Sequence, residues 1–172
     1  MPRKEIDEVV VRTAELKDID SIMHMCSMLA EENGIFRPDD RRVFMELLPL
    51  FQQNGGIIGV IGDVGEPLEG MVILKIGSLW YSSDPIVEER VVFVHPKFRK
   101  ASGGRARRLC QFSKKVSDEL GFPLIIGIVS NNRTQSKVKL YESEFGSPAG
   151  AFFLYGAKTG QWKRPKNEAA FK

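Results

Sequence analysis

The chain has 172 residues and a mass of 19.4 kDa, a length that fits one domain with a short tail. Hydrophobic residues make up 42% and charged residues 27%, which is typical of a globular protein and excludes disorder of the whole chain. The longest apolar runs, 57–61 and 124–129, are far shorter than the roughly 20 residues of a membrane-spanning helix. Because the first residues lack the apolar core of a signal peptide and only two cysteines occur, we expect a soluble cytoplasmic protein with no disulfide framework, metal site or membrane partner.

The net charge of +3 conceals an uneven distribution of charge along the chain. Eight basic residues and no acidic residue fall between positions 97 and 115. Without these eight, 17 basic residues oppose 22 acidic ones, so the remainder of the chain carries a net charge of −5. Such a run is either a solvated helix face or a binding site for a polyanion, and the run alone does not decide between them.

The first half of the chain contains strand and helix patterns. A β-branched run at 8–12 predicts a strand, and apolar residues at helical spacing predict a helix over 18–32. A second helix is expected over 38–48. The apolar runs at 57–61 and 70–76, separated by a turn, predict an antiparallel hairpin.

The second half begins with a predicted strand over 88–94, followed by a helix over 104–120. The nearly continuous apolar run at 124–129 is typical of a strand that is covered on both faces. A fourth helix is expected over 131–145 and another strand over 151–156, before a polar C-terminal tail.

The predicted order of elements is β-α-α-β-β-β-α-β-α-β, with room for one more short strand. A run of antiparallel strands followed by a strand–helix–strand crossover predicts an α+β fold of the α/β/α sandwich type. Its mixed, mostly antiparallel sheet would have six to seven strands flanked by four helices. The order excludes a doubly wound parallel sheet and a barrel. We assign residues 1–160 to a single domain and residues 161–172 to a C-terminal tail or short terminal strand.

The most informative segment runs from the strand end at 91–94 through a basic, glycine-bearing turn into the helix that begins near Gly104. The first N–H groups of a helix have no intrahelical acceptor, and the helix dipole makes this end positive. Glycines let the backbone approach an anion closely, so phosphate is the natural ligand, and Arg99 and Arg105 add charged donors. Neither Gly-x-x-x-x-Gly-Lys-Ser/Thr nor Gly-x-Gly-x-x-Gly occurs in this segment.

This segment resembles the GNAT acyltransferase superfamily. The family signature is a strand that ends in an apolar-Val-x-Pro turn, followed by Arg/Gln-x-x-Gly-x-Gly/Ala at the start of a long helix. Here Val94-His95-Pro96 matches the turn and residues 99–104 match the loop, with Ser102 in place of the first glycine. The order of elements also agrees with the family's fold from about Val9 to Gly156, so the resemblance covers most of the chain.

The resemblance implies transfer of an acetyl group from acetyl-CoA, as cosubstrate, to an amine by direct attack in a ternary complex. The CoA pyrophosphate would lie on the backbone N–H groups at the start of the helix. The pantetheine arm would pair with the exposed strand edge at 92–94, where a backbone N–H, that of Val94, would polarise the thioester carbonyl. The residues that the resemblance assigns to CoA are Val92, Phe93, Val94, Arg99, Lys100, Ser102, Gly103, Gly104, Arg105, Ala106, and either Asn131 or Asn132.

Three side chains are candidates for the proton transfers that this reaction needs. Glu88 and Glu89 lie on the strand that leads to Val94, and strand alternation puts them on opposite faces of the sheet. One of them should point towards the acceptor cleft as a base, although a solvated strand end would give the same pattern. Tyr141 lies in a Leu-Tyr-Glu sequence that is similar to the family's, whose tyrosine often protonates the departing thiolate. A tyrosine packed on the sheet is the alternative, and the spacing from Asn131 is longer than usual in the family.

Acidic residues in the region of the first two helices, Glu31, Glu32, Asp39 and Asp40, favour a cationic amine acceptor. Two other functions remain open. The basic segment 97–115 could belong to a protein that binds or modifies nucleic acid, or the chain could be a GNAT-like protein that binds CoA without catalysis. A homodimer is compatible with the sequence.

Overall fold

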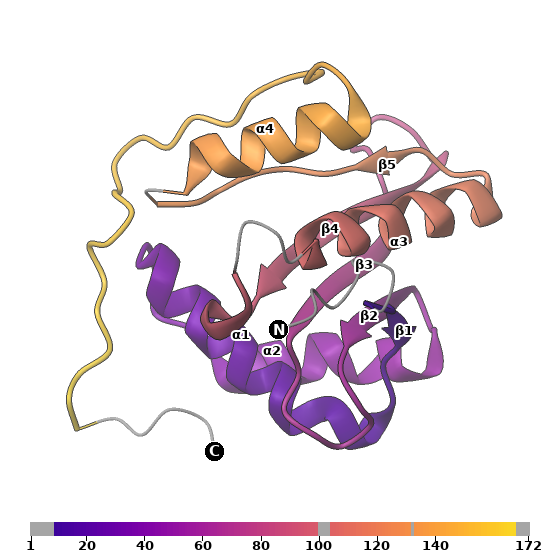
Figure 1. The fold of residues 1–172 in the computed structure, drawn as a ribbon. Helices are drawn as coiled ribbons and strands as arrows, with labels where there is room; N and C mark the ends of the chain where they lie inside the picture. Colours follow the sequence, from indigo (N-terminus) through magenta and orange to yellow (C-terminus); the bar gives the residue numbers. More distant parts are fainter. Residues whose placement is uncertain (1–8, 100–103, 132, 168–172) are drawn as a thin grey trace, which may run out of the picture.

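The computed structural model describes residues 9–99, 104–131 and 133–167. Its sheet has the strand order β1-β2-β3-β4-β5, in which β1 to β4 are antiparallel and β5 is parallel to β4 (Figure 1). The strands are β1 Arg12–Thr13, β2 Gly56–Ile61, β3 Gly70–Ser78, β4 Pro85–Val94 and β5 Leu124–Ile125. The helices are α1 Ile19–Asn33, α2 Asp40–Leu47, α3 Arg105–Leu120 and α4 Thr134–Phe145, with short 3-10 helices at Leu16–Asp18, Leu48–Gln52 and Pro96–Phe98.

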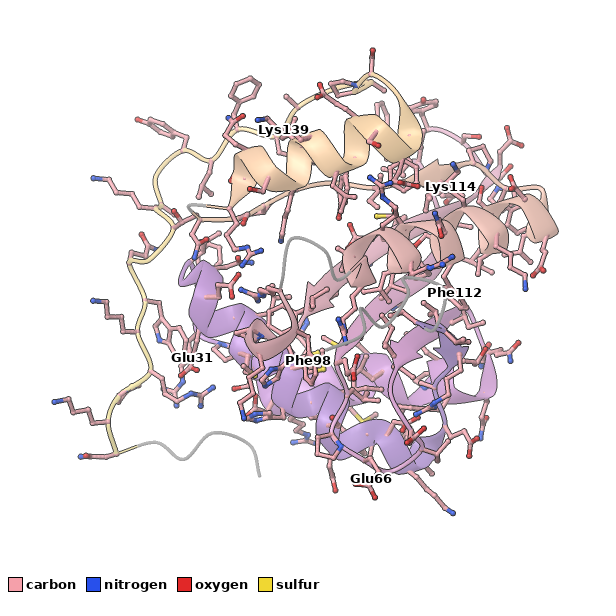
Figure 2. All side chains as sticks on the ribbon, viewed as in Figure 1. Glu31, Glu66, Phe98, Phe112, Lys114 and Lys139 are labelled. Carbon is pink, nitrogen blue, oxygen red and sulfur yellow. The ribbon has the colours of Figure 1, made fainter. Side chains whose placement is uncertain are left out.

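Helices cover both faces of the sheet (Figure 1). On one face, α1 and α2 enclose a buried apolar cluster in which Ile22 of α1 packs with Met71 of β3. On the other face, Leu109 of α3 belongs to a second cluster with Val72 of β3. Phe112 points from α3 towards the sheet (Figure 2), and α4 packs beside α3. The layers confirm the predicted α+β class.

The sheet is smaller than the sequence predicts. It has five strands in the described residues, where six to seven are predicted. The segment 151–156 forms no strand, because its apolar side chains do not join the sheet and Phe152 packs against Gly127 instead. The predicted strand 124–129 pairs only over β5, and Ile125 is 41% exposed because β5 has no strand on its outer side in this sheet. The first strand starts at Arg12, where pairing with β2 begins.

The four predicted helices are present. Gly34 and Gly121 end α1 and α3 in the left-handed conformation, with φ of 57° and 68°. Asp39 caps α2 by accepting a hydrogen bond from the backbone N–H of Arg42 at 2.9 Å. The last helix, α4, starts at Thr134, inside its predicted range. No helix in the described part of the chain combines the length and the apolar character needed to cross a bilayer.

A bulge in β4 decides which of its side chains face each helical layer. Glu89 and Val91 lie opposite consecutive residues of β3, so Arg90 is an extra residue in β4. Val91 packs with the α1 cluster as a result, whereas Glu89 faces the α3 side. A bulge bends a strand and increases its twist. The two residue pairs that join β4 to β5 end at Glu88, and β4 leaves β5 from that point.

Asp18 is a fully buried carboxylate that ties the start of α1 to the sheet. It accepts two hydrogen bonds from Arg12, at 2.8 and 2.9 Å, and one each from the backbone N–H groups of Glu15 and Gly65, at 2.8 and 3.0 Å. Desolvation raises the pKa of Asp18, but these bonds outweigh it, and the pKa lies below its ordinary value. Its contribution to stability is therefore lost as the pH falls through that lowered pKa.

We expect Asp18→Ala to lower the free energy of unfolding by about 3 kcal/mol, because it leaves the Arg12 guanidinium and two backbone N–H groups without their acceptor. Denaturant unfolding at neutral pH measures this. The control, Asp20→Ala, removes an exposed acid from the first turn of α1 and should cost less than about 1 kcal/mol. Equal losses in the two variants would contradict the structural role of Asp18.

Candidate functional site

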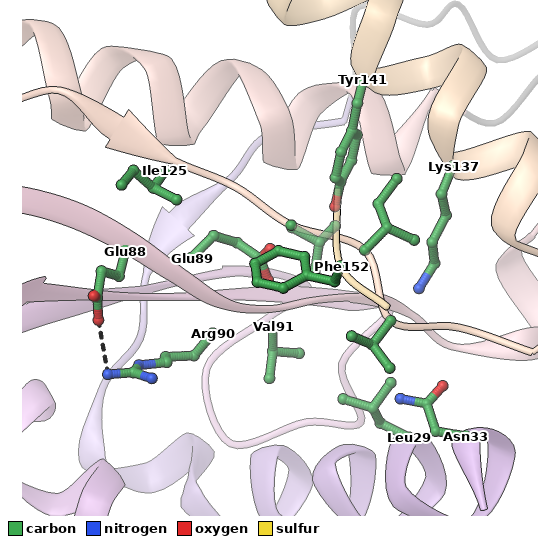
Figure 3. Close-up of a pocket in the computed structure, with 14 residues that line it drawn as sticks. Leu29, Asn33, Glu88, Glu89, Arg90, Val91, Ile125, Lys137, Tyr141 and Phe152 are labelled. Atoms are coloured by element: carbon green, nitrogen blue, oxygen red, sulfur yellow. Dashed lines mark ion pairs between the residues drawn. The ribbon is translucent and has the colours of Figure 1, made fainter. Parts of the chain in front are cut away.

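A pocket with a volume of about 330 Å³ opens where β4 and β5 separate (Figure 3). Its wall is built from β4, the chain that includes and follows β5, α4, the end of α1 and one residue of the C-terminal segment. The lining residues are Leu29, Asn33, Glu88, Glu89, Arg90, Val91, Val92, Ile125, Gly127, Ile128, Val129, Lys137, Tyr141 and Phe152.

Glu89 contributes a titratable carboxyl group to this pocket. It keeps some exposure to the pocket, but protein surrounds it on its other sides, and this burial raises the pKa of Glu89 to about 7. A hydrogen bond from the backbone N–H of Gly127 and the charges of Lys137 and Arg90 act in the opposite direction. A carboxyl group with this pKa can accept and release a proton near neutral pH.

Glu88 lies on the opposite face of β4, where its partner in β3 is Lys75. Lys75 in turn is paired with Glu46 of α2, which places this face on the α1–α2 side. The Glu88 carboxylate forms an ion pair with Arg90 at 2.8 Å (Figure 3). Of the two glutamates that the sequence singles out, Glu89 is therefore the enclosed one and Glu88 the one neutralised at the rim.

Two side chains of α4, those of Lys137 and Tyr141, point into the pocket (Figure 3). Burial raises the pKa of Tyr141, and the charge of Glu89 raises it further, so the phenol is protonated at neutral pH. Burial lowers the pKa of Lys137, against the opposing effect of the charges of Glu32 and Glu89. The sequence analysis does not identify Lys137, although its i, i+4 spacing from Tyr141 places both on one face of a helix.

The predicted CoA-binding segment is described only in part. Lys100, Ser102, Gly103 and Asn132 lie outside the described residues. Gly104 precedes α3 with φ of 62°, in the left-handed region that favours glycine. The backbone N–H of Arg108 is bonded to the Gly104 carbonyl at 2.9 Å, so the N–H groups of residues 105–107, which include Ala106, precede the helical ladder.

Carboxylates hold both of the arginines for which the sequence predicts contact with phosphate. Arg99 pairs with Glu32 of α1 at 2.7 Å and donates through Nε to the carbonyl of Val94 at 2.6 Å. Arg105 pairs with Glu69 at 2.6 Å. The basic segment, which has no acid of its own, thus takes acidic partners from distant parts of the chain. Contact of these arginines with CoA stays a prediction.

The strand end at Val92, Phe93 and Val94 lies beyond the pairing between β4 and β5. Among the described residues, no strand pairs with the β5-facing edge of this stretch, whereas its other edge pairs with β3. The side chains of Val92 and Phe93 are buried in the two apolar clusters, so the backbone is the part available to a ligand. An open strand edge is the geometry that the predicted pantetheine pairing requires.

Asn131 ties the connection between β5 and α4 to the end of α1. Its Nδ2 donates to the carbonyl of Glu32 at 2.5 Å. Three side-chain oxygen atoms of this region are buried and have no hydrogen-bond partner in the described part of the chain. They are Oδ1 of Asn131, Oγ of the preceding Ser130, and Oδ1 of Asn33, the residue after Glu32. Contact of Asn131 with CoA stays a prediction. Within residues 9–99, 104–131 and 133–167, no group of three or more His, Cys, Asp or Glu side chains is arranged to hold a metal ion.

Comparisons with known proteins identify this architecture. No protein-family model matches the sequence, and no curated protein matches it. Solved structures do match. The aminoglycoside N-acetyltransferase AAC(6')-Iy, in complex with the bisubstrate analogue CoA-S-monomethyl-acetylneamine, superimposes with a TM-score of 0.65 at 17% identity, over 86% of this chain and 97% of that chain. This chain has the GNAT fold.

Two further GNAT-fold structures agree with this assignment. A ribosomal-protein-alanine N-acetyltransferase from Brucella melitensis biovar Abortus has a TM-score of 0.62 at 18% identity, over 86% of this chain and 97% of that chain. An aminoglycoside acetyltransferase from an uncultured soil metagenomic sample, in complex with sisomicin, has a TM-score of 0.62 at 14% identity, over 88% and 97%. At these identities the likeness establishes the fold, and the residues of the pocket must carry any statement about chemistry.

The raised pKa of Glu89 should make the stability of the protein depend on pH. A carboxyl group whose pKa is higher in the folded than in the unfolded protein stabilises the fold at low pH, and this contribution is lost as the pH rises from the ordinary glutamate value to about 7. We therefore expect Glu89→Gln to be more stable than the unaltered protein at pH 8 by about 2 kcal/mol and to differ little at pH 5. Denaturant unfolding at the two pH values measures this difference. Glu142→Gln, an exposed position on α4, should change stability equally at both, and an advantage of Glu89→Gln that is independent of pH would contradict the raised pKa.

Proposed function

We propose that this protein is an acetyl-CoA-dependent N-acetyltransferase that transfers the acetyl group to a primary amine by direct attack in a ternary complex. The observation that carries the proposal is the pocket at the open edge of β4, in which Glu89 and the protonated Tyr141 face the same space. The GNAT fold and the CoA complexes among the similar structures support acetyl-CoA as the cosubstrate.

CoA would lie along the open edge of β4 and end at the start of α3. Its pyrophosphate would accept hydrogen bonds from the N–H groups of residues 105–107, which precede the helical ladder at the positive end of the helix dipole. Gly104 leaves no side chain in the way of that approach. Because Arg99 and Arg105 already have carboxylate partners, the phosphates would compete with Glu32 and Glu69 for them.

The backbone of Val94 supports a role in stabilising the oxyanion. Its carbonyl accepts the Arg99 bond, whereas the carbonyl of Phe93 lies against Gly70 of β3. In an extended strand the N–H and C=O of one residue point to the same edge, so the Val94 N–H points to the open edge as well. A donor there can polarise the thioester carbonyl and stabilise the charge that develops on its oxygen.

The remaining chemistry is transfer of protons. In our proposal Glu89 removes a proton from the ammonium form of the acceptor, directly or through a water molecule, and the amine nitrogen then attacks the thioester carbon. The tetrahedral intermediate collapses with cleavage of the carbon–sulfur bond, and the proton of Tyr141 passes to the departing thiolate. The amine nitrogen loses its second proton as the amide forms, and this proton returns the Tyr141 phenolate to the phenol. Bringing the amine and the thioester together in one site supplies much of the acceleration, so no covalent enzyme intermediate is needed.

The acceptor is less defined than the cosubstrate. The acidic residues that favour a cationic amine are largely engaged: Glu31 pairs with Arg164 at 2.8 Å (Figure 2 labels Glu31), Glu32 pairs with Arg99, and Asp39 caps α2. The net negative charge near the end of α1 is thus smaller than the sequence indicates. A panel of acceptors must therefore contain neutral amines beside polyamines, aminoglycosides and lysine peptides.

Binding of the cosubstrate is tested by a charge placed at the start of α3. We expect Ala106→Glu to weaken binding of acetyl-CoA at least about tenfold, because a carboxylate in the first turn repels the pyrophosphate although it suits the helix dipole and so should not harm folding. Thermal melting with acetyl-CoA and with CoA reports the affinity, since a ligand of the native state raises its melting temperature. Gln111→Glu adds the same charge further along α3, at an exposed position, and should bind nearly normally.

Equal affinities of the two variants would contradict the placement of the pyrophosphate. A single-stranded oligonucleotide in the same melting assay tests the alternative function of the basic segment. Stabilisation by the oligonucleotide and not by CoA would replace our proposal with nucleic-acid binding.

Turnover with the acceptor panel tests the catalytic roles. We expect Glu89→Gln to reduce kcat/KM about 100-fold or more and Tyr141→Phe to reduce kcat about tenfold, because each removes a group that transfers a proton. The kcat/KM of the unaltered enzyme should rise with pH through the pKa of Glu89, about 7. Glu142→Gln and Tyr155→Phe, both at exposed positions, serve as matched controls and should retain activity. Tight binding of acetyl-CoA without acetylation of any amine would favour the non-catalytic alternative.

A further inference from the structure

Phe152 is the one residue beyond α4, among those described, that lines the pocket. Phe152 is itself 73% exposed, so only part of the ring contacts the protein, whereas Phe153 is 94% exposed and Tyr155 101% exposed. Neither belongs to the pocket lining. One side of the Phe152 ring therefore lies at the pocket, while the rest of it faces solvent.

The Phe152 ring contacts Gly127. A Cβ atom at Gly127 would lie 2.8 Å from Cε2 of Phe152 and 3.6 Å from Cδ2 and Cζ, so the ring rests directly on the glycine backbone. The N–H of Gly127 is the backbone donor to the Glu89 carboxylate. Phe152 therefore covers the peptide that holds Glu89, and Figure 3 shows its ring in front of Glu89 and below the hydroxyl of Tyr141.

The charged and titratable groups around Glu89 come from three elements. They are Arg90 on β4, Lys137 and Tyr141 on α4, and Cys110 on α3. The stretch 151–155 contributes none, since its sequence is Ala-Phe-Phe-Leu-Tyr and the tyrosine is fully exposed. Any effect of Phe152 on Glu89 must therefore come from excluding water rather than from adding a charge.

We propose that Phe152 is a positioning residue that covers Glu89, keeps water from its carboxyl group and thereby sets the pH at which that group accepts a proton. For catalysis this inference rests on the proposed function, because it makes Phe152 the residue that matches the base to neutral pH. The shielding itself is a property of the protein without substrate.

The test is a titration of the Glu89 carboxyl group by NMR, with isotope-labelled glutamate and assignment of the signal by Glu89→Gln. We expect Phe152→Ala to lower the pKa of Glu89 by about one unit or more, because water reaches the carboxylate. Phe152→Leu keeps an apolar side chain at this position, so the pKa of Glu89 should stay close to that of the unaltered protein. Phe153→Ala removes the adjacent exposed ring and should leave the titration unchanged.

A second variant displaces the Phe152 ring by a substitution at Gly127, the residue that the ring contacts. Gly127→Ala places a methyl group where the ring lies, so it should displace Phe152 and lower the pKa of Glu89 in the same direction. In Phe152→Ala the methyl group meets no ring, so the double variant should titrate like Phe152→Ala alone. Additive shifts, or a Phe152→Ala protein whose Glu89 titrates as in the unaltered protein, would overturn the proposal.

The outcome is separable from that of the proposed function. In an active enzyme the rise of kcat/KM with pH should move to lower pH in Phe152→Ala by the shift that NMR measures. Acetylation with no shift in either measurement rejects the role of Phe152 and leaves the proposed function standing. A shift in the NMR titration of a protein that acetylates no amine supports the shielding by Phe152 and rejects the proposed function.

Discussion

The end of hydrogen bonding between β4 and β5 is the constraint on which the site depends. The two strands pair at two residue positions only, and the bulge at Arg90 follows directly in β4. Beyond it, the backbone groups on this edge of β4 need partners other than a strand. Arg99 supplies one by donating to the Val94 carbonyl, and a ligand can supply others. A β5 that continued to pair would fill the pocket and satisfy the whole edge.

The same separation explains the environment of Glu89. Once β5 has diverged, the chain after it passes beside Glu89 and presents the N–H of Gly127 to the carboxylate. Tyr141 and Phe152 then enclose the space from α4 and from the C-terminal segment (Figure 3). A carboxyl group on an ordinary edge strand would face water. Here protein surrounds it, and this burial raises its pKa to about 7 although the charges of Lys137 and Arg90 act in the opposite direction.

Much of the fold could be predicted from local patterns, because apolar spacing and capping residues act over short distances. The helical patterns correctly predict α1 and α3, which end at Gly34 and Gly121, where the backbone adopts the left-handed conformation. The prediction of a strand over 151–156 is wrong, because an apolar run forms a strand only where it can pair with the edge of a sheet. Alternation correctly separates Glu88 from Glu89, but it does not indicate which of them is enclosed, and it contains no sign of the bulge.

The charged residues show most clearly which properties follow from the sequence and which from the tertiary structure. By itself, the sequence determined that a basic segment joins a strand to a helix at a glycine-bearing turn, because the order of residues is enough to establish that. Only the tertiary structure decided that Glu32 and Glu69 neutralise Arg99 and Arg105, and that Gly127, Lys137 and Phe152 surround Glu89. These partners lie tens of residues away along the chain, and the pKa of a carboxyl group depends on what folding brings within a few ångströms of it.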